Sequence, residues 1–338
     1  MDETQVNIEE MLRKSTVRDD LPLSVNGSFP SQEAAQELLN TVMGFAKIFG
    51  SVFDLSALDG ITIADDYVAA LNGVDRGYPD MNGPTPTNDV FGAGFAMAVP
   101  VLRDGVHKSH VVLNSALIRP IVDPENQFYG LAVHTLCHEM AHVYDHMLRS
   151  KALPGLYGSQ MTDLREAVLM QLAMGVWNEY AASRLSAHWG TPDYCSGYEE
   201  SLLPMLDTIL SRSEAAKKDF ANHRNVERAM SELREILGTF FVRASYLTGH
   251  TDGLGRPLEE EAPKLAAALR KTTWFNTILT RGVNILREMF DKIESWEGLE
   301  AYVPLKDLFE EMYLRGGMKF VKLPDGRYFV QFMKTASL

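Results

Sequence analysis

HTLCHEMAHVYDH, residues 134–146, is the most informative stretch of this 338-residue chain. It places His138 and His142 four residues apart, puts Glu139 directly after the first histidine, and contains no proline. On a helix, two histidines at this spacing project from one face and can chelate a single ion. Glu139 lies about 100° further round such a helix, so it would not be a ligand but could reach a metal-bound water as a general base. The stretch therefore predicts a buried metal-binding helix.

Zinc is the ion that this pattern favours. A zinc ion with three protein ligands and one open position lowers the pKa of its bound water to near neutrality, which makes a nucleophile strong enough to attack an amide bond. His134 and His146 extend the row, but a four-residue step drifts by about 40° on a helix, so all four histidines cannot face one ion. We interpret His134 and His146 as residues behind the ligands or at the surface, with a ligand role for either as the alternative.

The flanking segments predict the elements around this helix. Upstream, the apolar runs 95–102 and 109–118 enclose RDGVHK, whose Asp-Gly pair is typical of a β-hairpin turn. Earlier still, Ser31 is placed to cap a helix that ends at Gly50. The Gly- and Pro-rich stretch 77–88 predicts a long loop. The motif helix itself is expected over residues 127–150.

The third ligand is expected on the helix that follows, over residues 161–188. A metzincin would need Gly at position 145 and His at position 148, but the chain has Asp145 and Leu148, so that class is excluded. Glutamate is the remaining common choice.

The following helix offers Glu166 and Glu179, which lie thirteen residues apart and roughly 220° round its axis, so only one can face the metal. We choose Glu179, because Ala182 and Ser183 on its face are small enough to let two helices approach closely.

HExxH followed by a glutamate on a later helix resembles the pattern of the gluzincins, the thermolysin-like zinc peptidases. HEMAHVYDH is also similar to the HExxHxxxH form of the ImmA/IrrE metallopeptidase family, and EYAASRLS is similar to its glutamate motif, with Ser183 and Leu185 where that motif has Asn and Phe. The resemblance covers about 60 residues. It implies a zincin-like catalytic unit, in which a small antiparallel sheet packs on the motif helix, and a zinc ion held by His138, His142 and Glu179.

Gluzincins usually add a side chain that donates to the developing oxyanion. The resemblance leads us to Tyr246 and His250 in RASYLTGH for this role, with Tyr144 and Tyr180 as alternatives nearer the motifs. Each of these is also compatible with an ordinary core or loop position.

The composition of the chain argues against several classes of function and location. A net charge of -13 argues against a broad nucleic-acid-binding surface, because such binding depends on Lys and Arg neutralising phosphates. Cys137 and Cys195 are the only cysteines and are expected as reduced thiols. The N-terminus lacks the apolar stretch of a secretory signal, and no run is long and apolar enough to cross a membrane, so we expect a cytoplasmic protein.

The expected fold class is therefore α+β. We divide the chain into a polar lead-in over 1–30, a catalytic domain over 31–190 and a mainly helical region over 191–338 that ends in a hairpin. The leading hypothesis is a zinc metallopeptidase that cleaves a protein or peptide. Two alternatives are a regulatory zinc protein, whose helical region binds a protein partner with restricted or no proteolysis, and a helical interaction protein with a fortuitous HExxH.

Overall fold

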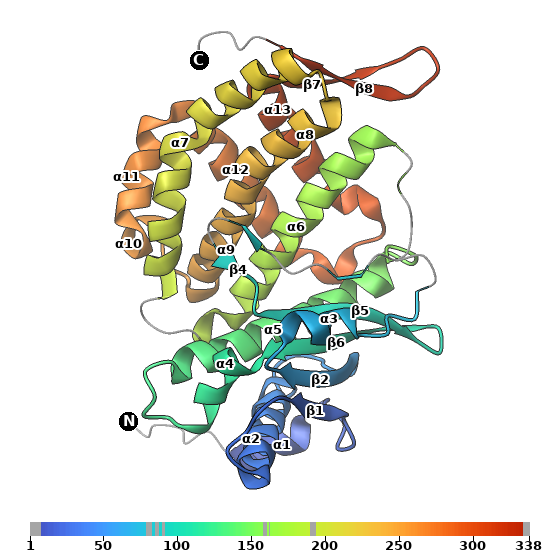
Figure 1. The fold of residues 1–338 in the computed structure, drawn as a ribbon, viewed down its shortest axis with the longest axis vertical. Helices are drawn as coiled ribbons and strands as arrows, with labels where there is room; N and C mark the ends of the chain where they lie inside the picture. Colours follow the sequence, from blue (N-terminus) through green and yellow to red (C-terminus); the bar gives the residue numbers. More distant parts are fainter. Residues whose placement is uncertain are drawn as a thin grey trace. The chain divides into compact units, whose positions relative to one another are not determined.

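The computed structural model describes residues 8–78, 83–84, 88–89, 92–157, 161, 163–189 and 194–333. The chain forms two compact units, whose helices and strands are labelled in Figure 1. The first unit contains Met1–Gly158 and Leu185–Thr191, and the second contains Ser159–Arg184 and Pro192–Leu338. This division differs from the expected catalytic domain over 31–190, because most of the helix that carries Glu179 belongs to the second unit.

The first unit is built on a four-stranded sheet in the order β1-β2-β6-β5. Its strands are β1 (Leu23–Asn26), β2 (Leu58–Ala64), β5 (Ala96–Arg103) and β6 (Val106–Asn114). Strands β1, β2 and β6 are parallel, and only β5 runs antiparallel to its neighbour β6. The expectation of an antiparallel sheet is therefore wrong. Helix α2 (Gln32–Phe49) connects β1 to β2 as a crossover, which allows the two strands to be parallel.

Strand β1 lies in the segment that the sequence suggests is a polar lead-in. It pairs with β2 from Leu23 opposite Ile61 to Asn26 opposite Ala64. Its alternating half-buried and exposed pattern is that of an edge strand with one covered face. A short helix, α1 (Ile8–Lys14), precedes it.

Local signals in the sequence account for several element boundaries. The Ser31 hydroxyl accepts a hydrogen bond from the Ala34 amide and caps α2, as predicted. The predicted hairpin between β5 and β6 turns at Asp104 and Gly105, which both have the positive φ that a two-residue hairpin turn requires. The loop expected over 77–88 lies partly outside the described residues.

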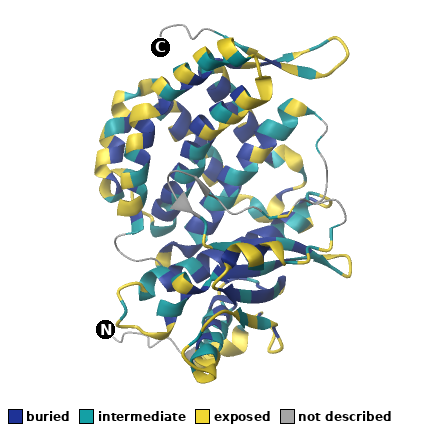
Figure 2. Cartoon of the chain, in the orientation of Figure 1, coloured by how far each residue is buried: buried dark blue, intermediate teal, exposed yellow. Residues whose placement is uncertain are grey.

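Helices cover both faces of the sheet. The motif helix α5 (Tyr129–Ala152) packs against β5, β6 and α2 on one face. The other face carries the short helix α3 (Tyr67–Asn72), whose Tyr67 and Leu71 pack against valines of β5 and β6. Figure 2 shows the central strands between these helices mainly as buried and intermediate residues. The remaining short elements of this unit are β3 (Asn88–Asp89), β4 (Gly92–Ala93), α4 (Ser115–Ile118), η1 (Arg119–Val122) and η2 (Ala187–Trp189).

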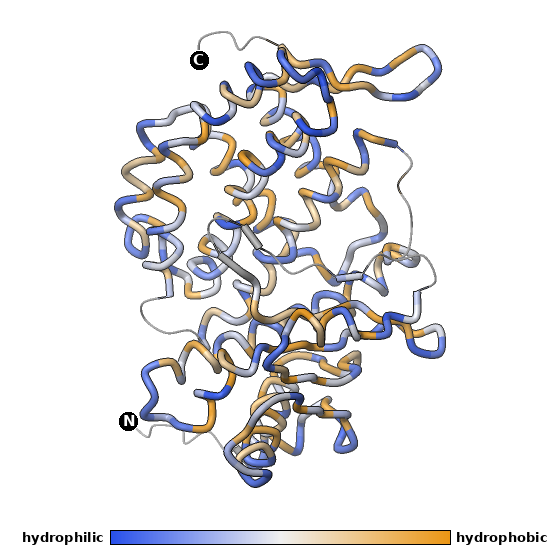
Figure 3. The backbone as a smooth tube through the Cα atoms, in the orientation of Figure 1, coloured by the Kyte–Doolittle hydropathy of each residue, from blue (hydrophilic) through white to orange (hydrophobic). Residues whose placement is uncertain are grey.

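The second unit consists of helices and a terminal hairpin. Its helices are α6 (Leu164–Ser186), α7 (Tyr194–His223), α8 (Val226–Leu233), η3 (Arg234–Gly238), α9 (Thr239–Leu254), α10 (Leu258–Glu261), α11 (Pro263–Lys271), α12 (Thr273–Asp291), η4 (Ile293–Ser295), η5 (Leu299–Tyr302) and α13 (Val303–Arg315). Hydrophilic and hydrophobic residues alternate along them in Figure 3, as amphipathic helices require. Strands β7 (Met318–Lys322) and β8 (Tyr328–Phe332) form the predicted second hairpin.

The helical stretch near residues 217–247 is interrupted. Arg224 has a φ of 55°, and the Asn225 side chain then caps α8 by accepting from the Arg228 amide. A π-helical turn, η3, follows α8. The mainly helical character of this region is confirmed. No helix among the described residues is long and apolar enough to cross a membrane.

Candidate metal centre

His138 and His142 converge on one face of α5, as their spacing predicts. Their Nε2 atoms lie 3.1 Å apart, and both side chains are buried, with 7% and 8% of each residue exposed. Two imidazoles that bind one zinc ion tetrahedrally at 2.0–2.1 Å place their nitrogens roughly 3.3 Å apart. The pair therefore already has a geometry close to that of two ligands of one ion.

The helix is held in place by its apolar positions. Leu136, Cys137, Met140 and Ala141 are completely buried around the histidines. Burial raises the pKa of the Cys137 thiol, so it remains protonated and behaves as a small apolar side chain, as expected from its context.

Glu139 lies beside the histidine pair and is 6% exposed. Its charge acts on Tyr67 at the start of α3: burial mainly, and Glu139 next, raise the pKa of the Tyr67 hydroxyl. Within the described residues, the Tyr67 hydroxyl is buried without a hydrogen-bond partner. Sequence reasoning missed Tyr67, because a tyrosine at an apolar helix position carries no local sign of a polar neighbourhood.

The two outer histidines of the row are also buried, which excludes a surface position for them. His134 is 1% exposed and its ring centroid lies 6.1 Å from that of His138. His146 is 8% exposed, and its Nδ1 lies 3.0 Å from the Ser109 hydroxyl on β6. His146 therefore connects the motif helix to the sheet.

Asp145 also has a local partner. Its Oδ2 accepts from the Nε of Arg149, one turn along α5, at 2.8 Å, and both side chains are completely buried. The structure shows Asp145 in a buried ion pair within its own helix.

Glu179 lies on α6 in the second unit, where tyrosines surround it. Its charge raises the pKa values of Tyr246, Tyr194 and Tyr198, although burial is the largest cause for each. Tyr246 also donates a hydrogen bond to the Glu179 carboxylate. The structure thus brings together Glu179 and Tyr246, which were both singled out from the sequence.

The other sequence candidates have partners of their own. The ring of His250 contacts that of Tyr194 in a tilted arrangement, with centroids 4.6 Å apart. Tyr180 donates to Asp252 at 2.6 Å, and Tyr144 stacks on Phe53. Glu166, the glutamate that we did not choose, forms an ion pair with Lys306.

A second group of ligand-type side chains lies at the junction of α7 and α8. Asp219, His223 and Glu232 have ligand atoms within 4.8 Å of one another. However, Arg228 already bridges the two carboxylates, at 2.6 Å from Asp219 and 2.7 Å from Glu232. The Nδ1 of His223 accepts from the Asn225 amide, so the neutral ring carries its proton on Nε2 and cannot use that atom as a ligand. This group therefore forms an ion-pair cluster.

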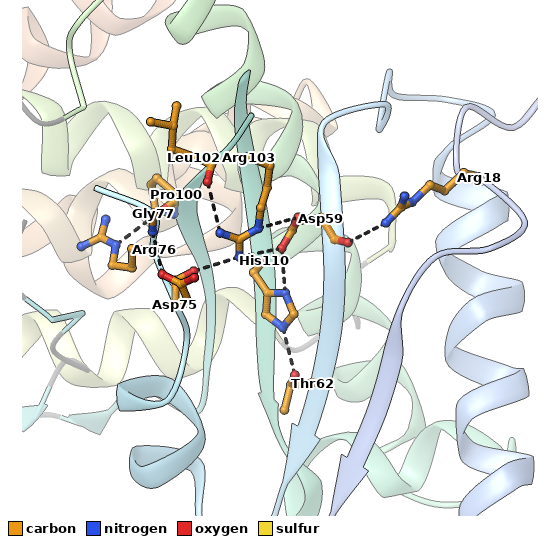
Figure 4. A network of polar contacts seen from close by, with 10 residues as sticks. All are labelled: Arg18, Asp59, Thr62, Asp75, Arg76, Gly77, Pro100, Leu102, Arg103 and His110. Carbon is orange, nitrogen blue, oxygen red and sulfur yellow. Dashed lines mark hydrogen bonds and ion pairs between the residues drawn. The ribbon is translucent and has the colours of Figure 1, made fainter. Parts of the chain in front are cut away.

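A polar network crosses the face of the sheet opposite α5 (Figure 4). The Nδ1 of His110 donates to Asp59 at 3.3 Å, and its Nε2 accepts from the Thr62 hydroxyl at 2.9 Å. Arg103 donates to both oxygens of Asp59. These side chains line a cavity of about 740 Å³, but they satisfy one another, so the network holds strands together.

No family model, no curated protein and no solved structure matches this chain.

Proposed function

We propose that this chain is a zinc-dependent metallopeptidase that hydrolyses peptide bonds of a protein or peptide. The observation that supports this best is the convergence of the His138 and His142 Nε2 atoms at 3.1 Å, with Glu139 on the adjacent helix position. A stability argument does not explain this arrangement, because burying polar side chains generally costs free energy. A metal-binding role explains why two imidazoles and a carboxylate are buried together.

The proposal includes Glu179 as the third ligand. His138, His142 and Glu179 offer two imidazole nitrogens and one carboxylate oxygen, the donor set of a catalytic zinc site with an open position.

Glu139 would act as the general base. A zinc ion bound by the three ligands would polarise water and the carbonyl of the substrate. The buried Glu139 carboxylate would accept the proton of the attacking water and transfer it to the departing amine. Because Glu139 is 6% exposed, little bulk water competes for this proton.

Two other functions give different outcomes in the same experiments. A regulatory zinc protein, with a partner bound by the helical second unit, would bind metal without general peptidase activity. A helical interaction protein with a fortuitous HExxH would bind no stoichiometric metal. The cytoplasmic location expected from the sequence is part of the proposal.

The direct test is the zinc content of the purified protein, measured by elemental analysis after dialysis against zinc and then buffer. We expect about one zinc ion per chain in the wild type and loss of that zinc in His142→Ala and Glu179→Ala, because either change leaves only two ligands. His223→Ala and Glu166→Gln are matched controls, since they remove the same chemical groups from side chains that pair elsewhere.

A wild type without zinc would overturn the enzyme proposal and favour the helical interaction protein. Zinc that persists in Glu179→Ala, but not in His142→Ala, would overturn the third ligand alone. Bound zinc without cleavage of a diverse peptide mixture, read by mass spectrometry, would favour the regulatory protein.

A further inference from the structure

Helices α6 and α9 approach unusually closely where Gly249 meets α6. A Cβ atom added at Gly249 would lie 2.4 Å from the carbonyl oxygen of Tyr180 and 3.1 Å from the Cβ of Ser183. Ser183 follows Glu179 by four residues, and Tyr246 precedes Gly249 by three, so each pair shares a helix face. The close approach therefore brings Tyr246 of α9 to Glu179 of α6.

Three tyrosines, which we call the tyrosine cluster, surround this contact: Tyr194, Tyr198 and Tyr246. The Tyr246 ring stacks on the Tyr198 ring, with centroids 5.3 Å apart and planes 19° apart. The hydroxyls of Tyr194 and Tyr198 lie 3.0 Å from each other. The ring of Tyr246 is held by stacking on Tyr198, and its hydroxyl donates a hydrogen bond to the Glu179 carboxylate.

A phenol has one hydrogen to donate. If the Tyr246 hydroxyl donates that hydrogen to Glu179, it cannot at the same time donate it to the oxyanion of a substrate. The hydrogen bond therefore points to a different role from the oxyanion donor that the resemblance suggests.

We propose that Tyr246 is a positioning residue that fixes the Glu179 carboxylate for metal binding. This inference rests on the proposed function. A glutamate side chain has several rotatable bonds, and ordering it costs conformational entropy. A hydrogen bond from a rigid, stacked phenol orients one carboxylate oxygen before the metal arrives. Removing such a supporting hydrogen bond typically weakens metal affinity by about 10- to 100-fold.

The test is the zinc dissociation constant of Tyr246→Phe, measured by competition with a chromophoric chelator. We expect zinc affinity to fall about 10- to 100-fold, with the ring and its stacking retained. Tyr198→Phe is the matched control, because it removes the same atom from the neighbouring ring, whose hydroxyl pairs with Tyr194. Its affinity is expected to stay within about threefold of the wild type, as for a hydroxyl that supports no ligand.

The outcomes separate this inference from the function on which it rests. Unchanged zinc affinity in Tyr246→Phe, with zinc still lost in Glu179→Ala, would overturn the positioning role and leave the metal site standing. Unchanged affinity with a large fall in kcat would assign Tyr246 to the oxyanion instead. An equal loss of zinc affinity in Tyr246→Phe and Tyr198→Phe would attribute the effect to packing of the tyrosine cluster and overturn the positioning role. A wild type without zinc would overturn both proposals.

Discussion

At the scale of single residues, the notable feature is how many polar side chains α5 buries. His134, Asp145 and Arg149 are each at most 1% exposed, and His146 reaches across to the hydroxyl of Ser109. Buried polar groups cost free energy unless they are paired, and the Asp145–Arg149 ion pair shows one way in which this helix meets that requirement. For the histidine pair with Glu139, metal binding is the reason that we propose.

Replacing Glu139 with Gln tests its role as the base. The amide keeps the size of the side chain but cannot accept a proton at neutral pH, so we expect kcat for peptide cleavage to fall by about 10²- to 10⁴-fold while zinc remains bound. The measurement is cleavage of a peptide found in the mixture screen, together with zinc content.

Glu199→Gln is a suitable control for this substitution. Glu199 is also buried, but it accepts hydrogen bonds from the backbone amides of Lys264 and Leu265 in the second unit. If Glu139→Gln cleaves as fast as the wild type, Glu139 is not the base. If it loses zinc, Glu139 contributes to binding the metal instead.

At the scale of elements, the close approach of α6 and α9 brings Glu179 to Tyr246. The contact depends on Gly249, since any side chain there would meet the backbone of α6 at 2.4 Å. Around it, Tyr180 bonds to Asp252, which forms an ion pair with Arg287 of α12. Three helices are thereby tied together next to the glutamate.

Substituting Gly249 with Ala is expected to separate α6 from α9. Overpacking of this kind costs about 1–3 kcal/mol, so the free energy of unfolding by urea should fall by that amount. Gly175→Ala is the matched control in the same unit, because its added Cβ would lie 3.7 Å from Val242 in ordinary contact. That control should be neutral or stabilise the helix by roughly 0.5–1 kcal/mol. Equal stability of the two variants would show that the crossing tolerates a side chain.

At the scale of the whole molecule, a chain of polar side chains connects the strands of the first unit's sheet. The protonation of one of them, His110, is coupled to folding. Asp59 and Thr62 of β2 and Arg103 of β5 face His110 of β6 (Figure 4). Burial, the largest cause, lowers the pKa of His110, and the nearby Asp59 carboxylate only partly opposes this effect.

The sign of the resulting pH dependence follows from this lowered pKa. The unfolded chain binds a proton at His110 below about pH 6.5, whereas the folded chain binds it only at lower pH. The contribution of His110 to stability is therefore complete above about pH 6.5 and is lost as pH falls towards its folded pKa. The measurement is the NMR titration of His110 and the urea midpoint at several pH values.

His110→Gln should remove this part of the pH dependence. A His110 resonance that titrates above pH 6.5, or a wild type and variant with parallel pH profiles, would contradict the expectation.

Much of the local structure can be predicted from the sequence. The Ser31 cap, the Asp104-Gly105 turn and the convergence of His138 with His142 all depend on spacings within one element or between adjacent ones. Such features follow from backbone geometry, so a single segment determines them. The parallel order of β1, β2 and β6 does not, because neither the partner nor the direction of a strand is encoded within that strand.

The same distinction between local and long-range features holds for the candidate site. The sequence by itself determined the histidine pair and the position of Glu139 beside it, since both concern the phase of residues on one helix. The choice of Glu179 over Glu166 stays a prediction. Only the tertiary structure decided that Glu166 pairs with Lys306 and that Tyr246 meets Glu179. Both contacts join residues far apart in the chain, so they form only when the elements pack.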